Sequence, residues 1–117
     1  MILVIVEDMI FLSKIQQTAA AAGVKVGPAM PDNLVEMLGR GQVSGVIIDL
    51  KHASGAALET VRRLKADPSS HPIPVVGFLS HVQAELAAAA REAGCDQVMA
   101  RSAFAQQLPQ LLRKLAG

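Results

Sequence analysis

Aromatic residues and an excess of either charge are missing from this sequence of 117 residues. It has no tryptophan, no tyrosine and three phenylalanines, so it has few rings on which nucleic-acid bases would stack. Its 11 lysines and arginines nearly balance 10 acidic residues, which leaves a net charge of +1. A nucleic-acid surface is usually strongly basic, and we therefore expect no direct nucleic-acid partner.

Cysteine and long apolar runs are scarce as well. Cys95 is the single cysteine, so no internal disulfide can form, which is typical of proteins in reducing compartments. No apolar run approaches the roughly 18 residues of a membrane-spanning helix. The first residues, MILVIV, lack the charged region of a secretion signal. We expect a cytoplasmic protein without a membrane contact, in which Cys95 acts as a small, partly buried hydrophobe.

The most informative stretch is GVIIDLKHASG at residues 45–55. Its apolar, β-branched run is typical of a strand that is buried on both faces within a parallel sheet. One carboxylate, Asp49, interrupts this run, and a buried charge costs free energy unless a partner compensates it. We therefore place Asp49 at the carboxyl end of a central strand, where open α/β sheets bind their ligands.

Strand and helix patterns alternate along the whole chain. Apolar runs predict strands at residues 2–6, 24–26, 46–50, 72–80 and 96–100. Between them, apolar stripes predict helices that end at Gly23, at Gly39 or Gly41, before Asp67-Pro68, and at Gly94. The second helix would bury Leu34, Val35 and Leu38, the third would span 56–65 and the fourth 82–93, and one last amphipathic helix would carry Phe104, Leu108, Leu111, Leu112 and Leu115.

Five strand–helix repeats predict a single α/β domain over residues 1–117. The natural arrangement is a three-layer, flavodoxin-like (βα)5 sandwich whose parallel sheet has the order 2-1-3-4-5. Strands 1 and 3 are then neighbours, so Glu7 and Asp8 would meet Asp49 at one edge. Clustered carboxylates repel unless a hard cation such as Mg²⁺ joins them. Ser80 and Arg101, which follow strands 4 and 5, would add a hydroxyl group and a cation suited to phosphate.

Taken together, these parts resemble the receiver domain of two-component response regulators over essentially the whole chain. The stretches that carry the resemblance are ILVIVED, VIIDL, PVVGFLS and GCDQVMARSAF. The resemblance implies Mg²⁺-dependent transfer of a phosphoryl group from a sensor histidine kinase or a phosphotransfer protein to Asp49, no further enzymatic activity, and a downstream protein partner. By position it implies metal ligands at Glu7, Asp8, Asp49 and the carbonyl of Lys51, and contacts to the phosphoryl group from Ser80 and Arg101.

Three features depart from the family pattern. Arg101-Ser102 stands where the family has Lys-Pro, and Arg101 would be able to pair with Asp49 in a resting state. The loop after Asp49 is short and has no proline, and Val98 takes the place of an aromatic switch residue. These departures favour a second hypothesis, a pseudo-receiver that serves as a phosphorylation-independent protein-interaction module. A flavin- or nucleotide-binding protein ranks last, because Glu7 and Asp8 would repel its phosphate.

Simpler roles remain open for the acidic and hydroxyl residues of this predicted edge. Asp49 would cap the turn that follows it, and Glu7 and Asp8 would cap the first helix. Ser80 would be the N-cap of the fourth helix.

The remaining expectations concern residues outside this predicted edge. His52, His71 and His81 lack the spacing of metal ligands and are expected on the surface or in loops. Met9 and Ile10 would narrow the mouth of the pocket, face a partner or belong to the core. The alanine-rich fourth helix would suit a homodimer contact, and no output domain follows Gly117 in this sequence, so we expect a free-standing domain.

Overall fold

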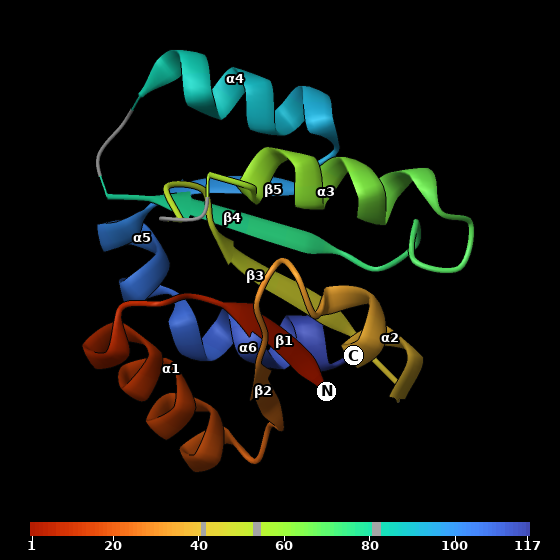
Figure 1. Cartoon of the computed structure of the whole chain (residues 1–117). Coiled ribbons are helices and arrows are strands. Elements are labelled where there is room, and N and C mark those ends of the chain that lie inside the picture. The colour runs from red at the N-terminus through yellow and green to blue at the C-terminus, as the bar shows by residue number, and fades with distance from the viewer. Residues whose placement is uncertain (41, 53–54, 81–82) are drawn as a thin grey trace.

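A computed structural model describes residues 1–40, 42–52, 55–80 and 83–117 (Figure 1). It contains a five-stranded sheet in the order β2-β1-β3-β4-β5, and all neighbouring strands are parallel. The predicted flavodoxin-like topology is therefore confirmed. The strands are β1 (Ile2–Ile5), β2 (Val26–Pro28), β3 (Gly45–Asp49), β4 (Val75–Leu79) and β5 (Gln97–Ala100).

Helices cover both faces of this sheet, and two separate apolar clusters lie between them (Figure 1). Alternate residues of β1 divide between the clusters, since Ile2 and Val4 face one and Leu3 and Ile5 face the other. The first cluster packs under α1 (Met9–Ala22), α5 (Arg101–Gln106) and α6 (Leu108–Ala116). The second packs under α2 (Leu34–Arg40), α3 (Ala57–Ala66) and α4 (Ala84–Ala93).

Two glycines end helices as the sequence predicted. Gly23 after α1 and Gly94 after α4 both have left-handed backbone angles, with φ of 72° and 114°, and their N–H groups bond to the last turn of the helix. At Gly94 a Cβ atom would also lie 2.6 Å from Cγ of Lys65. Any other residue type at this second position would require the Lys65 side chain to shift.

The second strand lies further along the chain than predicted. It spans Val26–Pro28 instead of 24–26, and Pro28 is paired with Val4 of β1. Proline cannot donate a hydrogen bond to a neighbouring strand, which normally excludes it from a sheet interior. Because β2 is the edge strand of this sheet, one side of it needs no partner, and Pro28 is tolerated there.

Other predicted boundaries also moved. The last helix is two helices, because the chain bends at Gln107 and Pro109 occupies the first turn of α6, where its missing N–H leaves no bond unmade. In α2, Val35 is 77% exposed and not part of the core, and Gly39 lies inside the helix, so it does not end it. Gly41 and Val82 lie outside the described residues. Among those described, no helix combines the length and apolar character that a membrane crossing requires.

Candidate functional site

The predicted site residues lie at one edge of the sheet because all five strands run in the same direction. Ile5 of β1 is paired with Ile48 of β3, so Glu7 and Asp8 follow one strand where Asp49 ends its neighbour. Ser80 follows β4, and Arg101 follows β5 as the first residue of α5. Glu7, Asp8 and Ser80 are exposed, whereas Asp49 and Arg101 are partly buried.

Asp8 is the N-cap of α1, which confirms the simpler role predicted for it. Its Oδ1 atom accepts hydrogen bonds from the backbone N–H groups of Ile10 at 3.0 Å and Phe11 at 3.1 Å. Its Oδ2 atom accepts a bond from Nη2 of Arg101 at 2.8 Å. The Arg101 bond, and after it the Phe11 N–H, lower the pKa of Asp8 below the ordinary value of 3.8. Asp8 is therefore a carboxylate at neutral pH with both oxygens engaged.

The partner of Arg101 differs from the prediction. We expected a possible ion pair with Asp49, but within the described part of the chain the ion pair of Arg101 is with Asp8. Arg101 also lies over the ring of Phe11, with 4.0 Å between the guanidinium carbon and the ring centre. The guanidinium group can donate hydrogen bonds in its plane while its flat face stacks on a ring. Arg101 does both, since it donates to Asp8 and stacks on Phe11.

The ring under Arg101 belongs to a compact aromatic cluster. Phe11 contacts Phe78 edge-on at 5.2 Å between ring centres, and Phe78 stacks on Phe104 at 4.8 Å. These are all three phenylalanines of the chain, and each is buried. The sequence patterns place Phe104 on the last helix, but they do not indicate that the three rings meet. Phe11 is on α1, Phe78 on β4 and Phe104 on α5, and all three side chains belong to the apolar cluster on one face of the sheet.

Asp49 caps the turn that follows β3, so its simpler predicted role is also observed. Its Oδ1 atom accepts a hydrogen bond from the N–H of Lys51 at 2.9 Å, and its carbonyl accepts one from the N–H of His52 at 3.1 Å. The turn directs His52 inward, where it is 4% exposed. His52 therefore lies in a loop, one of the two positions expected for it, but this loop position is buried and not on the surface. His71 is exposed as expected, and His81 lies outside the described residues.

Three further expectations can be compared with the structure. Ser80 is not the N-cap of α4, because Gln83 holds that position. Met9 and Ile10 are not core residues, since they are 73% and 86% exposed at the start of α1. Cys95 is buried as expected, and burial raises the pKa of its thiol to about 11.

Arg101 already occupies part of the acidic edge at which a Mg²⁺ ion would bind. In the described segments, no three His, Cys, Asp or Glu side chains are grouped so that they could hold a metal. Both oxygens of Asp8 are engaged, Oδ1 by N–H groups of α1 and Oδ2 by Arg101. The metal roles of Glu7, Asp8, Asp49 and Lys51 stay predictions.

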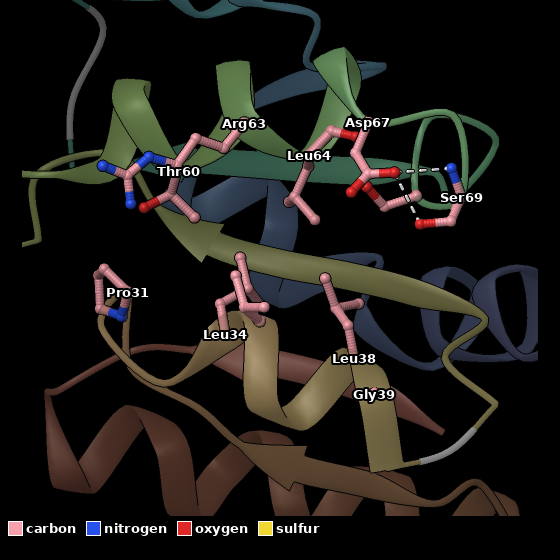
Figure 2. A pocket seen from close by; sticks show the side chains of 11 residues that line it. Pro31, Leu34, Leu38, Gly39, Thr60, Arg63, Leu64, Asp67 and Ser69 are labelled. Carbon is pink, nitrogen blue, oxygen red and sulfur yellow. Dashed lines mark hydrogen bonds between the residues drawn. The ribbon is translucent and has the colours of Figure 1, made fainter.

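A pocket of about 230 Å³ lies elsewhere, between α2 and α3. Figure 2 shows Leu34 and Leu38 of α2 across from Thr60 and Leu64 of α3. At one end the carboxylate of Asp67 accepts hydrogen bonds from Ser69 (Figure 2). None of the predicted site residues lines this pocket, so we keep the acidic edge of the sheet as the candidate site.

Comparison with known proteins supports the fold strongly. A search of protein-family models and a search of curated proteins each found no match. Among solved structures, the chain is similar to a response regulator from Thermotoga maritima, with a TM-score of 0.81 and 17% identity, over 98% of this chain and 95% of that one. It is similar to the phosphorylated cyanobacterial phytochrome response regulator RcpA, with a TM-score of 0.82 and 18% identity, over 97% and 89% of the two chains.

A third similar structure is the receiver domain of a sensor histidine kinase from Pseudomonas aeruginosa, which has a magnesium ion coordinated in its active-site cleft. Its TM-score is 0.82 at 15% identity, over 99% of this chain and 96% of that one. At such identities the similarity establishes the fold. The chain therefore has the fold of response regulator receiver domains, as the sequence predicted.

Proposed function

We propose that this receiver-fold chain is a signalling domain that works by binding a protein partner, without phosphoryl transfer to Asp49. The observation that carries the proposal is the 2.8 Å bond between Arg101 and Asp8. In a phosphoryl transfer to a carboxylate, a divalent metal offsets the repulsion between the two anions. Here one of the carboxylates predicted to hold such a metal, Asp8, is already paired with a cation of the chain itself.

The surroundings of Arg101 support the same proposal. The guanidinium group is held by the ring of Phe11 as well as by Asp8, so it has two attachments to α1. Val98 is partly buried on β5 and has no ring that would rotate in response to a change at Asp49. A receiver fold with these features is suited to presenting one constant surface to its partner.

A second candidate function is acceptance of a phosphoryl group on Asp49. The observation that favours it is the position of Asp49, which ends the central strand beside the acids of β1 and is partly buried. In this case a sensor histidine kinase or a phosphotransfer protein would be the donor and Mg²⁺ the cofactor. Ser80 would contact the phosphoryl oxygens, and Arg101 would have to leave Asp8 to reach them. A cytoplasmic location is expected for both candidates.

Intact-mass spectrometry distinguishes the two. The purified chain, Asp49→Asn and Arg101→Lys are each incubated with a small-molecule phosphodonor and Mg²⁺, and folding is checked by circular dichroism. We expect no mass increase in the folded wild type. The addition of one phosphoryl group to wild type, absent in Asp49→Asn and after metal removal, would overturn the first proposal and establish the second. An adduct only in Arg101→Lys would show that the arginine is what blocks the transfer.

A homodimer is a separate proposal. The alanine-rich helix α4 buries Ala87, Ala90 and Ala93, and its exposed face, which carries Ala84 and Ala88 beside Glu85, Arg91 and Glu92, would contact a second copy. Size-exclusion chromatography with light scattering at increasing concentration tests it. A strict monomer at the highest concentration would contradict the proposal.

A further inference from the structure

The cation of the acidic edge is part of the chain itself. We infer that Arg101 takes the place of a divalent metal ion beside the β1 acids, so that this site does not depend on Mg²⁺ and takes it up only poorly. The inference deepens the proposed function, on which it rests, because it names the group that keeps the domain in one state. The observation behind it is that an acidic residue predicted to bind Mg²⁺, Asp8, is bonded to Arg101.

The first step concerns the two oxygens of Asp8. Oδ1 is turned toward the start of α1, where it receives the N–H groups of Ile10 and Phe11. This capping fixes the carboxylate plane and aims Oδ2 at Nη2 of Arg101, 2.8 Å away. A bound Mg²⁺ ion would need an oxygen at roughly 2.0–2.1 Å. Mg²⁺ can therefore bind Oδ2 of Asp8 only if the guanidinium group of Arg101 moves away.

The second step concerns what holds the guanidinium group. Arg101 begins α5, and Phe104 on the same helix is fully buried, so the backbone at this point is anchored. The side chain then crosses to α1, where it stacks on Phe11, itself packed against Phe78 and Phe104. An ordinary surface ion pair has no such support and contributes little. Arg101 is 32% exposed and joins residues 93 positions apart.

These two steps predict competition between Arg101 and metal. When only a fraction of the protein is in the state that can bind a ligand, the apparent affinity for that ligand is reduced by the same fraction. If the bond to Arg101 is formed about nine-tenths of the time, removing Arg101 strengthens Mg²⁺ binding about tenfold. Mg²⁺ commonly binds through one or two carboxylates and several waters, so the acids that remain would be sufficient ligands for weak binding.

The test is a Mg²⁺ titration of four forms of the full chain, followed by the backbone amide resonances of residues 7–11 and by calorimetry. The forms are wild type, Arg101→Ala, Arg101→Ala with Asp8→Asn, and Arg101→Lys. We expect no saturable response of wild type at millimolar Mg²⁺, and a gain of about tenfold or more in Arg101→Ala that the added Asp8→Asn removes. Arg101→Lys keeps a positive charge but loses the planar group that stacks on Phe11, so it should also bind Mg²⁺ more tightly than wild type does, which keeps the test valid if Arg101→Ala is poorly folded.

Two results would overturn the inference. One is saturable Mg²⁺ binding by wild type that is as tight as in Arg101→Ala or Arg101→Lys. The other is a gain in Arg101→Ala that persists when Asp8 is replaced. Failure of the proposed function would look different: a wild type that accepts a phosphoryl group but shows no saturable Mg²⁺ response would contradict that proposal and leave this inference standing.

Discussion

Replacing Gly77 by alanine is the sharpest test of how the candidate site is packed. Gly77 lies in the middle of β4, paired with Ile48 on one side and Val98 on the other. A Cβ atom at this position would lie 2.9 Å from both Cγ and Cδ2 of Leu50. Leu50 is buried and directly follows Asp49. The alanine methyl group can enter only if Leu50 moves, and the turn that Asp49 caps would move with it.

The expected magnitude follows from two opposing effects. Overpacking a filled core costs about 1–3 kcal/mol. Alanine also restricts the unfolded chain more than glycine does, which stabilises the native state by about 0.4–1 kcal/mol. We therefore expect Gly77→Ala to lower the free energy of unfolding by about 1–2 kcal/mol.

Urea denaturation measures this loss, and Gly39→Ala is the matched control. Gly39 lies in helix α2, and a Cβ atom there would have no neighbour within 4 Å, so the same substitution should stabilise by about 0.5–1 kcal/mol. In Gly77→Ala the amide resonance of Lys51, which bonds to Asp49, should also shift. An unchanged or increased stability of Gly77→Ala, with Gly39→Ala behaving as expected, would refute the reasoning.

Three further predictions concern other parts of the chain. Because burial raises the pKa of Cys95 from 9.0 to about 11, its thiolate fraction at pH 8 is about 90-fold smaller than that of an unperturbed thiol, and iodoacetamide should modify the folded chain that much more slowly than the unfolded one. Lys65 donates to the carbonyls of residues 71 and 73 and to Asp96 at 2.8–3.1 Å, so Lys65→Met should lower the urea-measured stability by about 1–3 kcal/mol. Because the pKa of Asp8 is lowered, this carboxylate stabilises the fold above pH 3.8 and the contribution disappears as the pH falls through the lowered value. An NMR titration should therefore give Asp8 a midpoint below 3.8 in wild type and a higher one in Arg101→Ala.

The order of the elements could be predicted because local patterns decide it. Continuous apolar runs indicated buried parallel strands, and every predicted strand is present in the predicted order. The same reasoning placed Glu7, Asp8 and Asp49 near one another, since the carboxyl ends of parallel strands lie at one edge of the sheet. Ser80 and Arg101 were placed at that edge for the same reason.

Details that depend on a neighbour in space were predicted less well. Pro28 belongs to β2 only because β2 is an edge strand. Val35 has the apolar side chain of a core residue but faces solvent, because the sheet touches another side of α2. His52 is polar and follows a strand, yet its turn carries it into the interior.

The sequence by itself determined the topology and the inventory of charged groups at the edge of the sheet, because strand period and chain direction are local properties. Only the tertiary structure decided which of these groups pair. The sequence placed Arg101 near carboxylates at the ends of two strands, Asp8 after β1 and Asp49 on β3. It bonds to Asp8 because Phe11, one helical turn after Asp8, supplies a ring on which the guanidinium group stacks. That choice depends on the distance between α1 and α5, which come together on one face of the sheet only once β1 and β5, the strands that precede them, have taken their places in it.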